Sequence, residues 1–415
     1  MKNKLILGFT LIASTVFLVA QNEESSCYGC HLEQDEPYNI PAERFEDDIH
    51  AKAGLDCNIC HGGDPTAWDF EEAKDPEAGF IGVPSGPALI AICSKCHSDP
   101  LYIRRYNPSL PTDQEAKYWT SGHGRALENG DLSVATCVSC HGIHGIRKAA
   151  EPGSPVYQAN VAETCGKCHN DPEAMAKSGL PSNIVKQYKH SVHGVALLEH
   201  GDLAAPTCNN CHGNHGAAPP EAGSIQAVCG LCHVKNQDLF EETKMFNSFR
   251  TLGLHSCAAC HSAHDIQSLD NSVIALTEGS LCGRCHVAGD PGAQATLKIR
   301  SVIDKLRLNL DSAEVAIATA ENKGLEVDEL LFELLRGKTA LIQSRIYVHT
   351  FDTAQVEEAT LPGFNAAATI ITEVDKITAD FRMRRIGLGI ATIIISFLAI
   401  VLYLYIKSIE GIKPE

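Results

Sequence analysis

Cysteine and histidine are the residues in this 415-residue chain whose spacing points to chemistry. All 18 cysteines fall in nine Cys-x-x-Cys-His strings, so none remains for a lone catalytic thiol or an irregular disulfide framework. Two thiols three positions apart on a short helical turn can each bond a haem vinyl group, and the next histidine can ligate the iron. The nine strings are Cys27/Cys30/His31, Cys57/Cys60/His61, Cys93/Cys96/His97, Cys137/Cys140/His141, Cys165/Cys168/His169, Cys208/Cys211/His212, Cys229/Cys232/His233, Cys257/Cys260/His261 and Cys282/Cys285/His286.

Two other sites use a Cys-x-x-Cys pair, namely a zinc knuckle and a thioredoxin-like redox pair. Zinc sites normally combine two such pairs and do not require a histidine at the next position every time, whereas here it follows in all nine strings. The sequence therefore predicts nine covalently bound c-type haems between residues 27 and 286, about one for every 29 residues. So short a stretch cannot build an ordinary apolar core, and the haems themselves are expected to form it.

The strings belong to a repeated unit. Residues 121–132 align with residues 191–203, which contain one inserted residue. Each segment leads to a string with another histidine three positions after its end, and then to a string that opens Cys-Gly. A shorter copy begins at His255, and an earlier copy begins at His50 but has Asp64 where its second histidine should be. The architecture is one lone string followed by four pairs.

Nine haems need nine sixth ligands, and ten histidines lie outside the strings. Repeat position selects most of them, and of His190 and His200 one is expected to be spare. Ligation by two histidines favours ferric iron, so it predicts low-potential haems that pass electrons without binding substrate. If an open haem exists, we expect it at one of the first three strings, where the repeat assigns no partner. The predicted sixth ligands are His50, His123, His144, His190, His193, His215, His255, His264 and His349.

Both ends of the chain carry membrane-related signals. Basic residues followed by an apolar run that ends at Ala20 predict a secretory signal peptide over residues 1–20, with an uncleaved anchor as the alternative. Residues 386–406 form 21 positions without a charge, which is enough for a helix to span a bilayer. The arginines before this segment then lie on the exported side, against the positive-inside preference, but an exported domain outweighs them. The formal net charge of −17 argues against nucleic-acid binding.

A haem-free tail follows the last string. Apolar residues from Ile299 to Ala320, spaced alternately four and three, predict a helix with a packing seam that ends near Gly324. A second helix is expected over residues 327–350, with Leu331, Leu334, Leu335, Ile342 and Ile346 on one side. His349 lies on or near that face and is predicted to reach back to a haem. Pro362 and Gly363 are expected to break the chain, and residues 364–406 to form one helix that enters the bilayer.

The repeated Cys-x-x-Cys-His-x-x-His units resemble those of the doubled-CXXCH multihaem cytochromes c. The paired strings with a helical tail are also similar to the wider group of pentahaem nitrite reductases, octahaem hydroxylamine oxidoreductases and their electron-transfer relatives. The resemblance covers roughly residues 27–350 and implies a periplasmic location, covalent haem, stacked haems and the last histidine of each string as proximal ligand. The chain departs from those enzymes because no string ends in lysine and because it combines nine strings with a C-terminal anchor.

These features predict a mainly α-helical fold with much irregular structure. The expected divisions are a signal peptide (1–20), a nine-haem cytochrome c domain (21–292), a haem-free helical domain (293–385), a transmembrane helix (386–406) and a cytoplasmic tail (407–415). The expected function is electron transfer from a bacterial cytoplasmic membrane, in a single-pass protein with its haem domain in the periplasm. The expected partners are a quinone-reactive membrane subunit, for example of cytochrome b type, and periplasmic redox proteins. The alternative is a multihaem oxidoreductase acting on a small nitrogen or sulfur compound at one open haem.

Overall fold

The computed structural model describes residues 25–219 and 225–410, so the predicted signal peptide lies outside the described residues. Within this part the chain is helical, with many short helices, long irregular connections and no β-strand. This confirms the predicted fold class. The chain divides into two compact units, one of residues 25–185 and 200–219 and one of residues 186–199 and 225–410.

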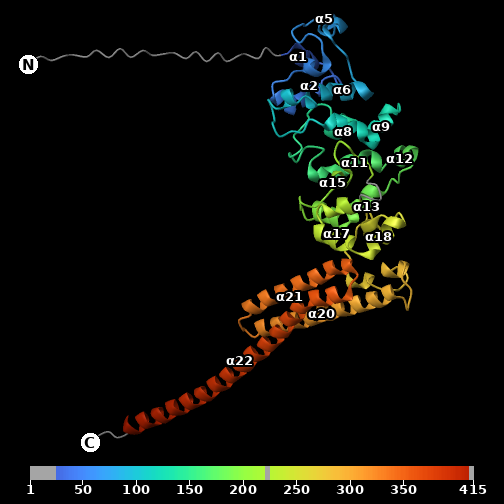
Figure 1. Cartoon of the computed structure of the whole chain (residues 1–415). Coiled ribbons are helices and arrows are strands. Elements are labelled where there is room, and N and C mark those ends of the chain that lie inside the picture. The colour runs from blue at the N-terminus through green and yellow to red at the C-terminus, as the bar shows by residue number, and fades with distance from the viewer. Residues whose placement is uncertain (1–24, 220–224, 411–415) are drawn as a thin grey trace, which may run out of the picture. The chain divides into compact units, whose positions relative to one another are not determined.

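The first unit consists of short helices that carry or flank the first six strings (Figure 1). A small cluster around Ile90, Tyr118 and Leu127 forms part of its apolar packing, and further buried residues such as Val161, Met175 and Val185 lie outside this cluster. That haems fill the rest of the core stays an expectation. Its helices are α1 (Ser26–Leu32), α2 (Ile40–Phe45), α3 (Ile49–Lys52), α4 (Cys57–His61), α5 (Phe70–Ala73), η1 (Pro76–Ala78), α6 (Gly86–His97), α7 (Pro100–Ile103), α8 (Gln114–Thr120), α9 (Gly122–Glu128), α10 (Cys137–His141), η2 (Gln158–Asn160), α11 (Val161–His169), α12 (Pro172–Ser178) and α15 (Cys208–His212).

The second unit contains the last three strings and the helical tail. Helix α13 (Ile184–His190) begins in the first unit and ends in the second. The other helices are α14 (Val192–Leu198), α16 (Ile225–Gly230), α17 (Val234–Glu241), α18 (Lys244–Thr251), α19 (Ser256–His261), η4 (Asn271–Val273), η5 (Cys282–Arg284), α20 (Pro291–Glu321), α21 (Asp328–Tyr347), η6 (Val348–Thr350) and α22 (Thr353–Glu410).

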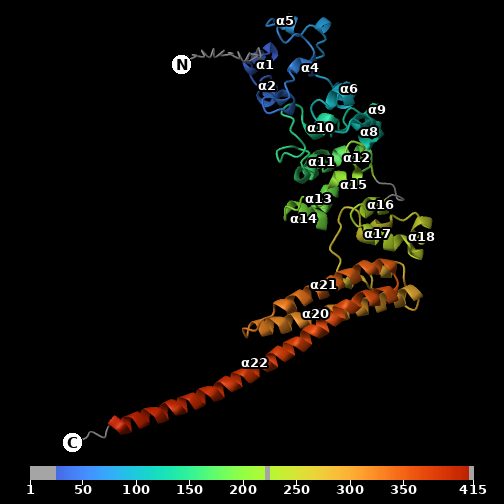
Figure 2. The same ribbon diagram turned by 60° about the vertical axis from the view of Figure 1, so that its left-hand side comes forward.

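Helices α20, α21 and α22 pack side by side into a bundle (Figure 2). All seven residues of the predicted α20 seam are buried, from Ile299 to Ala320, and the helix ends next to Asn322 as predicted. The predicted face of α21 is confirmed only in part, because Leu334 is buried but Leu331, Leu335 and Ile342 are exposed. The other buried positions of α21 are Gly337, Ala340 and Ser344.

Small residues on α21 and α22 explain this difference. A Cβ atom on Gly337 would lie 2.5 Å from the Leu310 side chain, and one on Gly363 would lie 2.8 Å from that of Leu306. The helices therefore approach one another closely where side chains are small, and the larger leucines of α21 remain on the outside. A hydrophobicity pattern does not reveal close packing of this kind. Glycine and alanine have small side chains and contribute little to such a pattern.

The predicted break at Pro362 is also wrong. Helix α22 runs through this proline without interruption, from Thr353 to Glu410. Proline removes one hydrogen bond and clashes with the preceding turn, at a cost of about 3 kcal/mol in a helix interior. Here Thr360, Gly363 and Ala366 are buried on either side of the proline against the other two helices, and this packing offsets the cost.

The C-terminal part of α22 is long and apolar enough to cross a membrane. Its most apolar 18-residue window has a mean hydropathy of 2.5, and none of that window is buried in the structure. Every described residue from Arg384 to Glu410 is exposed. Exposed apolar residues along a whole helix fit a single-pass membrane anchor, since they have no partner in water.

Candidate metal centres

The strings adopt two alternating local structures. Strings two, four, six and eight occupy the short helices α4, α10, α15 and α19. The residue after each has a positive φ: Gly62, Gly142, Gly213 and, in the last copy, Ser262. Strings three and five instead lie at the C-terminal ends of the longer helices α6 and α11. The repeat seen in the sequence is therefore a repeat of backbone structure.

The thiols of successive strings are neighbours within each unit. Cys27 interacts with Cys57, Cys60 with Cys93 and Cys96, Cys93 with Cys137, Cys140 with Cys168, and Cys165 with Cys208. In the second unit Cys229 interacts with Cys257, and Cys260 with Cys282 and Cys285. The order of the strings in space therefore follows their order in the sequence, inside each unit. This order was not predictable from spacing alone.

The second cysteine is exposed in six of the nine strings. The first cysteine of every string is partly buried. The polypeptide contributes little apolar packing around these short helices, so it covers one thiol of a string and leaves the other at the surface. An exposed thiol is accessible for covalent attachment, and haem bonding by these residues stays a prediction. The exposed cysteines are Cys30, Cys60, Cys168, Cys211, Cys232 and Cys285.

Six strings have a second imidazole ring opposite their own histidine. The ring centroids are 6.0–6.3 Å apart in every case. Two imidazoles that share one metal ion are expected at about this separation, because each metal–nitrogen bond is about 2 Å long. The pairs are His97 with His50, His61 with His144, His169 with His123, His141 with His215, His233 with His193, and His261 with His349.

The chemistry of these rings also suits metal ligation. Nδ1 of His61 lies 2.8 Å from the carbonyl oxygen of Gly82, and Nδ1 of His349 lies 2.9 Å from that of Ile346. A carbonyl can only accept, so Nδ1 carries the proton in both rings and the lone pair of Nε2 is left for a metal. His31 is oriented in the same way by the carbonyl oxygen of Tyr38, at 2.9 Å.

Burial favours the neutral, metal-binding form of these imidazoles. Desolvation lowers the pKa of nine of the twelve paired histidines, because a buried ring loses the hydration that stabilises its charged form. The nine are His97, His123, His141, His144, His169, His193, His215, His261 and His349.

The pairing follows a rule that the sequence did not reveal. His123 precedes string four but faces string five, and His50 and His193 likewise face the second string of their own pair. His144 and His215 follow strings four and six, yet they face strings two and four. The pair of strings two and three and the pair of strings four and five therefore each receive one imidazole from the repeat that follows.

A backbone hydrogen bond joins the segments of successive repeats that carry these histidines. The residue before the upstream histidine donates its N–H to a carbonyl two residues beyond the downstream histidine. The three bonds join Ile49 to Ile146, Gly122 to Ala217 and Val192 to Ile266, at 2.8–2.9 Å. By the same rule, a histidine at position 64 would face a string of the preceding repeat, and Asp64 occupies that position here. Asp64 instead accepts hydrogen bonds from Thr66.

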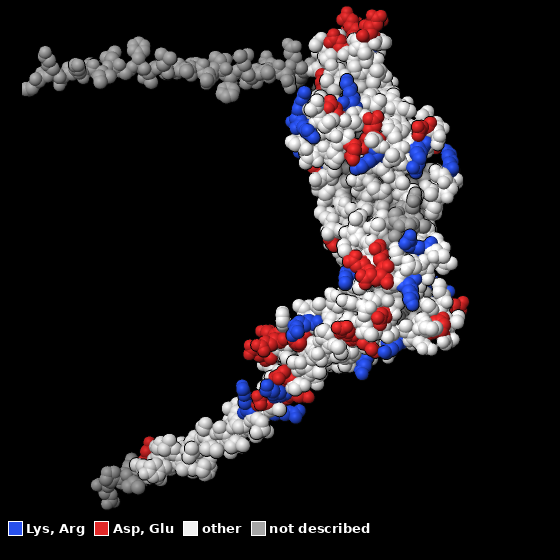
Figure 3. All heavy atoms as spheres, viewed as in Figure 1, with Lys and Arg blue, Asp and Glu red and all other residues white. Residues whose placement is uncertain are grey.

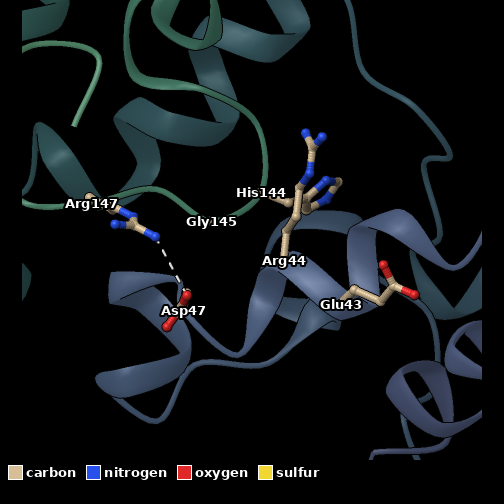
Figure 4. A pocket seen from close by; sticks show the side chains of 6 residues that line it. All are labelled: Glu43, Arg44, Asp47, His144, Gly145 and Arg147. Atoms are coloured by element: carbon tan, nitrogen blue, oxygen red, sulfur yellow. Dashed lines mark hydrogen bonds and ion pairs between the residues drawn. The ribbon is translucent and has the colours of Figure 1, made fainter. Parts of the chain in front are cut away.

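A cavity of about 340 Å³ lies beside the His144 ring (Figure 4). The side chain of Arg44 extends along that ring, and Arg147 pairs with Asp47 at 3.5 Å on another wall. Two guanidinium groups beside an imidazole that is a predicted iron ligand suit an anionic group such as a haem propionate. The lining residues are Glu43, Arg44, Asp47, His144, Gly145 and Arg147.

The histidines of strings one, six and nine also make polar contacts through Nδ1. His286 of string nine contacts Asp290 at 3.2 Å, and His31 of string one contacts Tyr38. His212 of string six directs Nδ1 at the carbonyl oxygen of Ala218, at 3.1 Å. Among the other predicted ligands, His190 directs Nδ1 at the carbonyl oxygen of its own helix at Lys186. His255 and His264 stay predicted sixth ligands, and His200 stays the alternative to His190 as the spare histidine.

The chain matches one known family model. The model describes the doubled CXXCH motif and covers residues 129–174, which contain strings four and five. This match supports a multihaem c-type cytochrome and indicates covalently bound haem c. In the comparisons with curated proteins and with solved structures, no protein matches the chain.

Proposed function

We propose that this chain is a membrane-anchored nonahaem cytochrome that passes electrons between the quinone-linked membrane chain and periplasmic acceptors. The six imidazole pairs at 6.0–6.3 Å carry this proposal. Bound haem would supply the one-electron iron couple, and the two facing histidines of a pair would hold its iron and leave no position for substrate. Within each unit, cysteines of successive strings lie close to one another, and this arrangement suits the stepwise transfer of electrons from one haem to the next.

The tail supports a membrane-side electron entry or exit at string eight. His349 lies in η6, between α21 and α22, and its ring faces His261 of that string at 6.1 Å. The helix that provides the candidate anchor therefore belongs to the same bundle as the segment that holds this ligand. A single helix offers no quinone pocket, so we propose a separate quinone-reactive membrane subunit, for example of cytochrome b type, as the partner on this side.

The N-terminal region supports a docking site for a basic periplasmic redox protein. Residues 25–83 contain fourteen Asp and Glu but only three Lys and Arg, and acidic side chains gather around α5 (Figure 3). Trp68, 69% exposed, lies against Gly29 between the two cysteines of string one. An exposed aromatic side chain with a charged rim is typical of a protein interface, and opposite charges would accelerate association.

The test of the proposed function is reduction of the purified, haem-loaded full chain in lipid vesicles. A quinol together with the candidate membrane subunit should reduce its haems, and the reduced protein should then reduce a small basic cytochrome. Haem content should be nine per chain. Failure to exchange electrons with both reagents, despite full haem loading and low-spin spectra, would contradict electron transfer.

One observation favours the alternative, an oxidoreductase with one open haem. Among the described residues, none of the six imidazole pairs includes His31 of string one. The first 122 residues contain His31, His50, His61 and His97, and the last three belong to pairs at strings two and three. Carbon monoxide binding by the ferrous protein, lost when Cys27 and Cys30 are replaced by alanine, would support this second function.

A further inference from the structure

The first repeat contains a buried carboxylate where the next two contain serine. Asp48, Ser121 and Ser191 each lie two residues before a paired histidine and cap the following helix. All three are buried, with at most 2% of the residue exposed. The two serine hydroxyls accept a backbone N–H of their helix and donate to the carbonyl of Tyr118 or Tyr188. Neither contacts an imidazole in this way.

Asp48 uses its charge differently. Its Oδ1 accepts from Nδ1 of His50 at 2.9 Å and from the His50 backbone N–H at 2.8 Å. Its Oδ2 accepts from the backbone N–H of Ile146 at 2.8 Å, in the segment that positions His144. The side chain is 3% exposed, so water screens this interaction little. The carboxylate is therefore held firmly against one candidate sixth ligand.

We propose that Asp48 is a positioning and tuning residue that makes the haem of string three the lowest in potential among the equivalent haems of strings three, five and seven. This inference rests on the proposed function, and specifically on ligation of that haem by His50 and His97. A carboxylate that accepts the Nδ1 proton makes the imidazole a stronger donor. Its negative charge also stabilises ferric over ferrous iron, since the ferric centre is more positive.

The contrast with other strings makes the effect specific. The rings of His61 and His349 are held by neutral carbonyls, which polarise Nδ1–H less than a carboxylate does. His286 also has a carboxylate partner, Asp290, but that side chain is 30% exposed and the contact is longer, at 3.2 Å. A low-potential haem at string three would lie between strings two and four in the series and set the potential at which electrons cross the N-terminal part of the chain.

The test is an EPR-monitored redox titration of the haem-loaded full chain. The rings of His50 and His97 lie at 89°, whereas those of His141 and His215 lie at 9°, so the string-three haem should give a highly anisotropic low-spin signal. Asp48→Ser, which installs the residue of the other repeats, should shift the midpoint of this signal to higher potential. Asp48→Asn, which keeps its shape but loses the charge, should shift it less.

Glu46→Ser is the matched control. It removes the same charge two positions away, from an exposed side chain outside the cavity beside His144. It should move the midpoint of the string-three signal little. Equal shifts in Glu46→Ser and Asp48→Ser, or no shift in a low-spin Asp48→Ser protein, would overturn the tuning role. If Asp48→Ser loses the low-spin signal, the midpoint is measured in Asp48→Asn instead, because an amide oxygen can still accept the Nδ1 proton of His50. An unchanged midpoint in Asp48→Asn also refutes the inference.

The ligation itself has a separate test. His50→Ala should convert the string-three haem to high-spin. If it does not, the proposed ligand is wrong. If it does, but the Asp48 variants leave the midpoint potential unchanged, the tuning role of Asp48 is refuted. Ligation by His50 and the proposed electron transfer are then unaffected.

Discussion

Removal of His349 tests whether the haem-free tail provides a ligand. This ring lies 6.1 Å from that of His261 with an interplanar angle of 13°, and the carbonyl of Ile346 holds its Nδ1. His349→Ala should leave the haem of string eight with one axial histidine and an open position. One string of nine is affected, so about one ninth of the iron should change from low-spin to high-spin.

The assay is quantitative EPR of the ferric protein together with carbon monoxide titration of the ferrous protein. Relative to wild type, His349→Ala should bind one more equivalent of carbon monoxide per chain. His190→Ala is the matched control, because His190 lies in the same unit but is exposed, whereas His349 is half-buried against the ring of His261. We expect no change in that variant. The reasoning would be refuted by an unchanged spin state in His349→Ala, or by the same increase in both variants.

Three further predictions concern the backbone, the bundle and the anchor. Ser262 has φ 63° and ψ 177°, in a region that only glycine adopts easily, so Ser262→Gly should raise the melting temperature by relieving strain of about 1 kcal/mol. Gly142→Ala should lower it by a comparable amount, because the added Cβ meets no atom within 4 Å and only the backbone conformation is penalised. Leu306 is fully buried between the bundle helices, and Leu306→Ala should cost about 2–5 kcal/mol in chemical unfolding of the tail. A chain ending at Arg385 should fractionate as a soluble protein with unchanged haem spectra, whereas the full chain should stay with the membranes.

The acidic N-terminal region offers a matched charge experiment. Glu71→Lys with Glu72→Lys should slow the reaction with a basic cytochrome and weaken its dependence on salt, since it removes attraction close to string one. Glu128→Lys with Glu151→Lys makes the same change in net charge at other exposed positions of the same unit. Equal rates for the two double variants, measured by stopped-flow absorbance, would locate the docking site elsewhere.

The sequence by itself determined the chemistry of attachment and the class of fold. Bonding of two thiols and one imidazole to a single cofactor is a local event, so a Cys-x-x-Cys-His string indicates it without knowledge of distant contacts. The buried seam of α20 could also be predicted, because large apolar side chains at helical spacing form one face that must be buried. The same reasoning held only in part for α21, where glycine and alanine allow close packing and leave leucines outside, and it failed at Pro362, where packing offsets the lost hydrogen bond.

Only the tertiary structure decided which histidine faces which string. The spacing suggests that each sequence repeat ligates its own haems. However, His144 and His215 face strings of the preceding repeat, and His349 reaches string eight from η6. The sixth ligand approaches from the opposite side of the iron, so its position depends on how neighbouring segments pack and is not encoded in a local motif. The same is true of Asp48, whose substitution for serine is visible in the alignment but whose contact with His50 is a consequence of the fold.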